Sequence, residues 1–171
     1  MLPDPVTDEP LPLRLVGKLL DWAVVLCGAG LMVLVFGNVI SRFLLALDIA
    51  WSSELATYLL VWGTFLGGAA AVRRRAHMRV AELVGLLHGQ ARRMAEIAIC
   101  LVVAGTLVPI VWFGVVVAEI QWPQLTTVLY WPVGLLYLAM PVGAAFCLLF
   151  VLHDAWRILQ GREHPAEPGG I

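Results

Sequence analysis

The sequence predicts an all-α integral membrane protein with four transmembrane helices and an amphipathic interfacial segment between the second and third helices. Two observations lead to this fold class. The 171-residue chain is 61% hydrophobic and only 13% charged, whereas a soluble domain carries about 25% charged residues. Its apolar residues also form long blocks, and an uncharged block of about 18 or more residues is long enough to cross a bilayer.

Charged residues bound the predicted spans. Each span contains about 20 residues, which corresponds to roughly 30 Å of helix and matches the hydrocarbon core of a bilayer. The first apolar block begins after Lys18 and Asp21 and ends before Arg42, and the second begins after Glu54. We therefore predict a single membrane domain over residues 1–171, with spans at about 22–41, 55–72, 97–118 and 132–152 and mobile tails at 1–13 and 161–171.

The basic residues predict the direction of the spans. With four spans, both tails and the loop between spans two and three lie on one side, and that side carries ten of the eleven lysines and arginines. Such residues favour the cytoplasmic side of a membrane, so both termini are predicted to be cytoplasmic. The net charge of -1 and the lack of a recognised nucleic-acid-binding pattern argue against a nucleic-acid partner.

The loop between spans two and three carries one apolar stripe, at residues 80, 83, 84, 87, 91 and 94. A helix with this pattern can lie in the membrane interface, with its apolar side chains in the lipid and its arginines near the headgroups. We predict such a segment at about 78–94. A basic cluster leads into it and is interpreted as a cytoplasmic interface anchor, with contact to a partner or to anionic lipid as the alternative. Its members are Arg73, Arg74, Arg75, His77 and Arg79.

The centres of the predicted spans contain no Asp, Glu, Lys, Arg or His. Ionisable residues at that depth mark ion paths, proton relays and ligand sites, and haem inside a helix bundle needs axial ligands such as His. We therefore predict no catalytic, cofactor-binding or metal site in this chain, and no enzymatic activity. Cys27, Cys100 and Cys147 lie inside apolar blocks without the spacing of metal ligands.

Span two carries the features of a helix-packing surface. Gly63 and Gly67 are four residues apart, and small residues at this spacing let another helix approach closely. The approaching helix belongs either to the same chain or to another subunit. Trp62 lies inside the span rather than near its end, which suggests that it also packs on protein.

Arg42 and Glu54 flank the outer hairpin between spans one and two. Their placement allows an ion pair, for which Asp48 is a competing partner. Alternatively, the Arg42 side chain extends to the lipid headgroups while its methylene groups stay in the apolar layer. The sequence leaves both arrangements open.

Two runs of residues then suggest a family: NVISRFLL at the end of the first span and WSSELATYLLVWGTFLGGAAAVRRRAHMRV over the second. Together they resemble the small membrane subunit of TRAP transporters (tripartite ATP-independent periplasmic transporters, the DctQ-like family), most strongly over residues 37–84. Ser53, Thr57 and Ala81 depart from the family pattern, which has an acid, an arginine and an aspartate at these positions. The matching residues are Asn38, Val39, Arg42, Trp51, Glu54, Ala56, Tyr58, Trp62, Phe65, Leu66, Gly67, His77, Arg79 and Val80.

The resemblance implies an accessory subunit of a bacterial inner-membrane transporter that imports an organic anion, such as a carboxylate or an acid sugar. A large membrane subunit would carry the substrate and the coupling ions, usually sodium, and a periplasmic binding protein would capture the substrate. The small subunit would support the large one, help to dock the periplasmic protein and hold no cofactor. The expected partner-interface residues are Arg42, Trp51, Glu54, Tyr58, Trp62, Gly63 and Gly67.

Two other functions stand beside this one. A membrane anchor of a respiratory enzyme would bind quinone or haem at its edge, near His77 or His153, and stoichiometric haem would give a Soret band. A stand-alone small channel or exporter would produce ion flux in liposomes.

Overall fold

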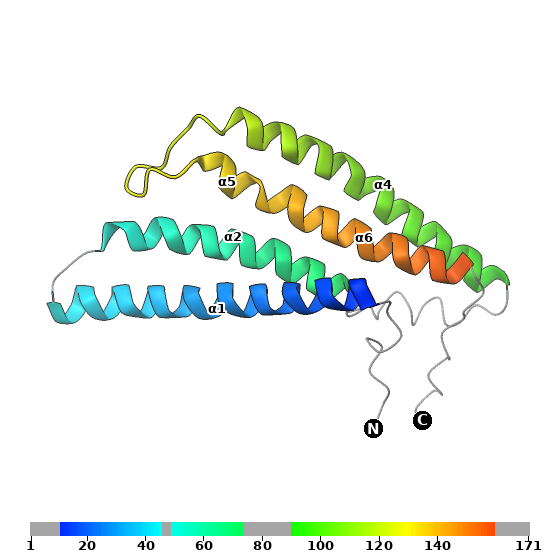
Figure 1. Cartoon of the computed structure of the whole chain (residues 1–171), viewed down its shortest axis with the longest axis horizontal. Helices are drawn as coiled ribbons and strands as arrows, with labels where there is room; N and C mark the ends of the chain where they lie inside the picture. The colour runs from blue at the N-terminus through cyan, green and yellow to red at the C-terminus, as the bar shows by residue number, and fades with distance from the viewer. Residues whose placement is uncertain (1–10, 46–48, 74–89, 160–171) are drawn as a thin grey trace, which may run out of the picture.

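The computed structural model of the chain describes residues 11–45, 49–73 and 90–159. Within these ranges the chain is almost entirely helical, and four stretches are long and apolar enough to cross a membrane. This confirms the predicted all-α membrane fold. The helices are α1 (Leu11–Leu45), α2 (Ala50–Arg73), α4 (Gln90–Ile120), α5 (Val133–Tyr137) and α6 (Ala139–Leu159) (Figure 1).

Three helices begin earlier than the predicted spans. Helix α2 begins at Ala50 rather than near residue 55. Helix α1 begins at Leu11 rather than near residue 22, so residues 11–13 of the predicted mobile tail are helical. Helix α4 begins at Gln90 rather than near residue 97. Charged side chains near a helix end can reach the interface without breaking backbone hydrogen bonds, so they do not end a helix. Residues 78–89 of the predicted interfacial segment lie outside the described residues.

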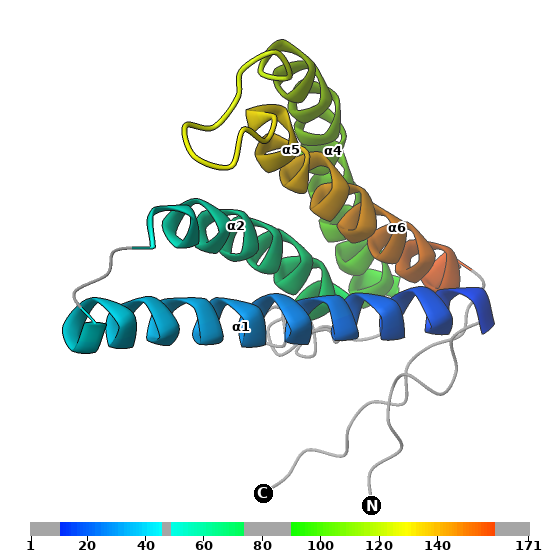
Figure 2. The ribbon, with the colours of Figure 1, turned by 60° about the vertical axis from the view of Figure 1, so that its left-hand side comes forward.

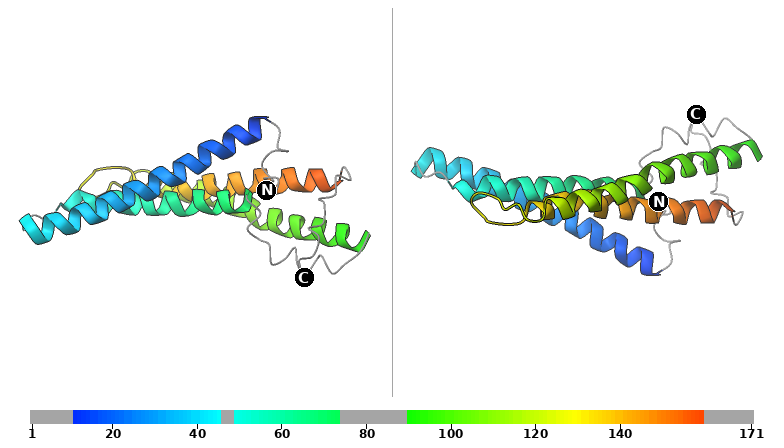
Figure 3. Two further views of the ribbon diagram at one scale, coloured as in Figure 1. Left: turned by 90° about the horizontal axis from the view of Figure 1, so that it is seen from below. Right: turned by 90° about the horizontal axis from the view of Figure 1, so that it is seen from above.

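Helix α1 is long compared with a bilayer. Its 35 residues correspond to about 52 Å, whereas the hydrocarbon core is roughly 30 Å thick. A helix of this length tilts in the membrane or extends beyond the core. Figure 3 shows that α1 crosses the other helices obliquely.

The long helices form an open layer rather than a closed bundle. In the described part of the chain, α1 packs on α2, α2 on α6 and α6 on α4, whereas the backbones of α1 and α4 do not meet. Figure 1 shows this order, with α1 and α4 at opposite margins. Lipid tails are as apolar as these helix surfaces, so no hydrophobic driving force closes the layer around a core.

The layer has two ends, because consecutive long helices run in opposite directions. We call the end that holds the α1–α2 connection and residues 121–132 the hairpin end. The opposite end, which holds Leu11, Arg73 and Leu159, is the terminal end. Figure 2 shows residues 121–132, drawn in yellow, above the start of α2 at the hairpin end.

A small core joins three helices toward the terminal end. Its buried members come from α1, α2 and α6 and are five apolar residues, two of which are alanines. Partly buried neighbours such as Val24 and Phe146 complete it. The core residues are Leu20, Leu66, Ala69, Ala70 and Phe150.

Glycines allow the closest helix contacts. A methyl carbon at Gly143 of α6 would lie 2.8 Å from Cβ and 2.9 Å from the carbonyl oxygen of Phe65 in α2. A methyl carbon at Gly114 of α4 would lie 2.9 Å from Cδ of Pro141 in α6. Pro141 is the third residue of α6, where the missing N–H of a proline costs little. Both glycines therefore set the spacing between neighbouring helices.

Candidate functional site: a polar seam on α2

Three side chains of α2 contact the connection between α4 and α6. Glu54, Tyr58 and Trp62 follow one another at four-residue steps, which places them on one face of the helix. Each makes a hydrogen bond to residues between 127 and 135. We call these three residues the α2 seam.

The connection opposite the seam is folded as a short hairpin. The N–H of Thr126 donates to the carbonyl of Trp131 (2.9 Å), and the N–H of Trp131 donates to Oγ1 of Thr126 (3.1 Å). Leu125 and Pro132 form an isolated antiparallel bridge. Tyr130 has a φ of 54°, a left-handed backbone conformation that residues other than glycine and asparagine rarely adopt. The chain therefore turns sharply between residues 126 and 131.

The carboxylate of Glu54 binds the tip of this hairpin. Its Oε1 atom accepts hydrogen bonds from the N–H groups of Thr127 (3.1 Å) and Val128 (3.0 Å) and from the Thr127 hydroxyl (2.6 Å). Its Oε2 atom accepts one from the N–H of Leu129 (2.8 Å). Three successive backbone N–H groups thus converge on one carboxylate, as in the backbone nests that bind anions.

The other two seam residues hold the beginning of the fourth span. The Tyr58 hydroxyl donates to the carbonyl of Pro132 (2.9 Å), and its ring meets the edge of the Trp131 ring at 5.7 Å between centroids. The Trp62 indole N–H donates to the carbonyl of Leu135 in α5 (3.2 Å). The Pro132 carbonyl also accepts the N–H of Leu135 (3.1 Å), so the Tyr58 hydroxyl is a second donor to a carbonyl at the start of the span.

The ion pair that the sequence allowed between Arg42 and Glu54 is not formed. Arg42 is exposed, and the structure places the Glu54 carboxylate on the hairpin instead. Four hydrogen-bond donors surround the Glu54 carboxylate in this position, whereas an exposed ion pair with Arg42 would contribute little stability. Asp48 lies outside the described residues. Trp51, at the start of α2, is 45% exposed.

The glycine face of α2 packs on α1 of the same chain. A methyl carbon at Gly63 would lie 3.4 Å from Cβ of Cys27, and one at Gly67 would lie 3.9 Å from Cγ1 of Val24. The structure thus shows α1 of the same chain against these glycines. Contacts within one chain do not test the prediction that Gly63, Gly67 and the seam also contribute to a partner interface.

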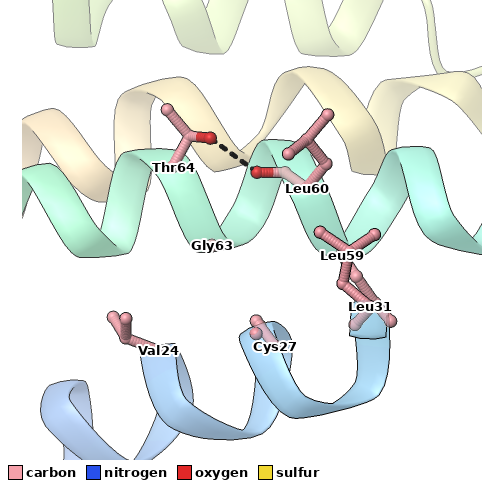
Figure 4. Close-up of a pocket in the computed structure, with 8 residues that line it drawn as sticks. Val24, Cys27, Leu31, Leu59, Leu60, Gly63 and Thr64 are labelled. Atoms are coloured by element: carbon pink, nitrogen blue, oxygen red, sulfur yellow. Dashed lines mark hydrogen bonds between the residues drawn. The ribbon is translucent and has the colours of Figure 1, made fainter. Parts of the chain in front are cut away.

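A shallow apolar groove of about 200 Å³ lies beside these glycines (Figure 4). The Thr64 hydroxyl on its rim donates to the carbonyl of Leu60 (2.7 Å), so its polar group is satisfied within α2. The groove is lined by Val24, Cys27, Gly28, Leu31, Leu59, Leu60, Gly63 and Thr64.

The structure places Arg73, a predicted interface anchor, inside the protein. Its side chain is only 2% exposed, and its guanidinium forms an ion pair with Asp21 of α1 at 3.2 Å. The guanidinium lies over Gly17, where a methyl group would collide with it. Arg73 thus joins α1 to α2 at the terminal end. The other predicted anchors, Arg74, Arg75, His77 and Arg79, lie outside the described residues.

Sequence reasoning missed several parts of these contacts. The sequence indicated Asp21 only as a boundary of a predicted span, and it predicted no role for Gly17. The partners of the seam are mainly backbone groups of residues 127–135. Every residue has such groups, so the residue types do not indicate which of them bind the seam. Among residues 11–45, 49–73 and 90–159, no three His, Cys, Asp or Glu side chains gather as a metal site would require.

Comparison with known proteins gives one family and two relatives. Residues 31–161 match the DctQ component of tripartite ATP-independent periplasmic transporters. The uncharacterized protein y4mM of Sinorhizobium fredii (strain NBRC 101917 / NGR234) is 30% identical over 143 residues, which cover 82% of this chain and 26% of that protein. The C4-dicarboxylate TRAP transporter small permease protein DctQ of Vibrio cholerae (serotype O1, strain ATCC 39315 / El Tor Inaba N16961) is 26% identical over 153 residues, 75% of this chain and 66% of that protein. The chain therefore spans about a quarter of the first relative and just under two thirds of the second.

Proposed function

Because the chain belongs to the DctQ family, the small membrane subunits of TRAP transporters, we propose that it is the accessory subunit that supports ion-coupled uptake of an organic anion by a larger membrane subunit. The observation that carries this proposal is the match over residues 31–161. It favours a transporter subunit over a respiratory anchor or a stand-alone channel.

The distribution of charge supports an accessory rather than a carrier role. No Asp, Glu, Lys, Arg or His lies at the centre of a predicted span. The ionisable residues of α1 and α4 lie near the ends of the predicted spans, for example Asp21 and Arg42 in α1 and Glu96 and Glu119 in α4. Carriers of anions and cations place polar or ionisable groups, or broken helices, near the centre of the bilayer. The substrate and the coupling ion, for which we expect sodium, would bind to the large subunit.

The open layer supports a scaffolding role. Its margins, α1 and α4, each pack on one long neighbour in the described part of the chain. Their outward side chains are large and apolar, for example Phe36 and Phe43 on α1 and Trp112 and Phe113 on α4. A row of helices of this kind presents wide apolar faces, against which a larger membrane protein packs.

We place the chain in the bacterial inner membrane with both termini in the cytoplasm, because basic residues of the described helices lie toward the terminal end, among them Arg14, Lys18, Arg73 and Arg157. The hairpin end then faces the periplasm. Trp51 and the hairpin that Glu54 holds are exposed there, within reach of a periplasmic binding protein. This surface is our candidate for docking that protein.

The two relatives support the substrate class and the arrangement. The Vibrio cholerae protein is named as a small permease for C4-dicarboxylates, which favours a carboxylate substrate here. In the Sinorhizobium fredii protein the matched segment is about a quarter of a longer polypeptide.

Uptake in whole cells tests the proposal. A strain without this chain, and the same strain with the chain restored, would be given a panel of radiolabelled dicarboxylates, acid sugars and neutral sugars. We expect at least one organic anion to be accumulated only by the restored strain, and only with a sodium gradient. Equal uptake of every anion by both strains would contradict the proposal.

A further inference from the structure

We propose that residues 127–129 form an anion-binding backbone nest whose ligand is the Glu54 carboxylate, and that Glu54 is thereby the positioning residue of the hairpin at residues 121–132. The nest consists of the N–H groups of Thr127, Val128 and Leu129 and the Thr127 hydroxyl. All four donors lie within 3.1 Å of a carboxylate oxygen.

The donor set selects a carboxylate over other polar groups. Both oxygens of an ionised carboxylate only accept hydrogen bonds, and here all four surrounding groups donate. The amide of a glutamine would turn its NH₂ group toward the nest at one of the two positions, so that a donor would face a donor. An aspartate keeps the charge but is shorter by one methylene group. The chemistry of the nest therefore predicts the order Glu, then Asp, then Gln or Ala.

The hairpin needs this ligand to keep its shape. Apart from the seam, its cross-connections are the hydrogen bonds of Thr126 with Trp131, of the Val133 N–H with the Gln124 carbonyl (2.8 Å) and of the Gly134 N–H with the Gln121 carbonyl (3.2 Å), all of which lie away from the tip at residues 127–129. The turn between them contains the left-handed Tyr130, a conformation that persists only when the surroundings enforce it. Glu54 holds the turn in this conformation, because its carboxylate accepts hydrogen bonds from three successive N–H groups of the turn.

The ordered turn presents a defined surface. Leu125, Val128 and Tyr130 are exposed on the hairpin, with Tyr130 the most exposed at 71%, and residues 121–132 carry no charged side chain. If the hairpin docks the periplasmic binding protein, a step that rests on the proposed function, then Glu54 sets the shape that this protein meets. Glu54 itself would act through the hairpin rather than by contact.

Limited proteolysis tests the nest without any partner. The purified full-length chain in detergent would be treated with chymotrypsin, and cleavage after Tyr130 would be followed by mass spectrometry. An ordered loop resists cleavage because the protease needs locally unfolded chain. We expect Glu54→Ala to be cleaved at this site about tenfold faster than the wild type, Glu54→Gln nearly as fast and Glu54→Asp at an intermediate rate. Thr57→Ala, an exposed change one residue before Tyr58, is the matched control and should leave the rate unchanged.

Chemical rescue distinguishes a nest from a general loss of structure. Sodium formate should slow cleavage of Glu54→Ala toward the wild-type rate with saturation, whereas sodium chloride at the same ionic strength should not. Thr127→Val, which removes one donor and leaves α2 unchanged, should accelerate cleavage more weakly. Equal cleavage of Glu54→Ala and wild type, or equal effects of formate and chloride, would overturn the nest.

Transport separates this inference from the proposed function. In proteoliposomes with the large subunit, Glu54→Ala should raise the concentration of periplasmic binding protein needed for half-maximal uptake and leave the maximal rate unchanged. An unchanged half-maximal concentration together with faster proteolysis would overturn the docking step and support the nest. Uptake that never depends on this chain would overturn the proposed function.

Discussion

Gly143 of α6 lies directly against the backbone of Phe65 in α2, so closely that a methyl carbon there would be 2.9 Å from the Phe65 carbonyl oxygen. This contact joins the α1–α2 pair to the α4–α6 pair in the middle of the layer. Close backbone approach at a small residue is the main source of helix association in lipid. The position of α6 on α2 therefore depends on the absence of a side chain at Gly143.

Gly143→Ala is expected to separate α2 from α6. Backbone atoms cannot yield to the added methyl as a flexible side chain could, and overpacking of this kind destabilises a protein by about 1–3 kcal/mol. The midpoint of thermal unfolding in detergent would measure the loss. Gly105→Ala in α4, where a methyl group would meet nothing within 4 Å, is the control and should not lower the midpoint. Equal behaviour of the two variants would contradict the close contact.

The ion pair between Asp21 and Arg73 predicts non-additive effects. The Arg73 side chain is 2% exposed and that of Asp21 28% exposed, so the pair is shielded from water more than an ordinary surface pair. We expect Asp21→Ala and Arg73→Ala each to lower the free energy of unfolding by about 1–3 kcal/mol, with the double variant losing much less than the sum. Unfolding in mixed detergent would give the three values. Lys18→Ala, an exposed basic residue of α1, should have little effect, and additivity would refute the coupling.

Gly17 provides an independent test of the same contact. Since a methyl group at Gly17 would collide with the Arg73 guanidinium, Gly17→Ala is expected to destabilise the protein in the wild-type background. In the Arg73→Ala background the collision disappears, so the same change should become neutral or slightly favourable, because alanine favours helix more than glycine. Gly28→Ala, at a position with open space around it, should behave alike in both backgrounds. A loss for Gly17→Ala that persists without Arg73 would rule out the collision.

Tyr58→Phe tests the seam without disturbing its packing. The change removes the hydrogen bond to the Pro132 carbonyl (2.9 Å) but retains the ring that meets Trp131. A single hydrogen bond of this kind contributes about 0.5–1.5 kcal/mol, and hydrogen exchange at the start of the fourth span should rise accordingly. Thr64→Val, which removes an exposed bond within α2 itself, should leave exchange in that region unchanged. No difference between these variants would mean that the Tyr58 hydroxyl does not hold the span.

The sequence predicts four helices that are long and apolar enough to cross a membrane, because each corresponds to a long uncharged block. Helix α1 still begins earlier than the first predicted span, at Leu11. Lys18 and Asp21 suggested a boundary because isolated charges are costly in lipid, but Asp21 is paired with Arg73. A charge that finds its partner in another helix does not end its own helix, and no local pattern reveals such a partner.

The three seam residues are among the predicted partner-interface residues, and that role stays a prediction. Glu54, Tyr58 and Trp62 were selected by a family resemblance, and their four-residue steps place them on one face. The groups that they bind were not predictable. Glu54 accepts hydrogen bonds from backbone N–H groups of residues more than 70 positions away in the chain, and the sequence does not show which backbone groups come close in the fold. Likewise, the spacing of Gly63 and Gly67 predicts a close helix, and only the structure identifies that helix as α1.

Affinity purification tests the accessory role most directly. The chain would be tagged at its C-terminus, extracted from its native membranes in a mild detergent, and purified together with whatever it binds, and the bound proteins would be quantified by mass spectrometry. We expect a large polytopic membrane protein in a near-equal molar ratio, with a periplasmic binding protein joining when substrate is added. A redox enzyme in place of that protein, or a chain purified without any membrane partner, would contradict the accessory role.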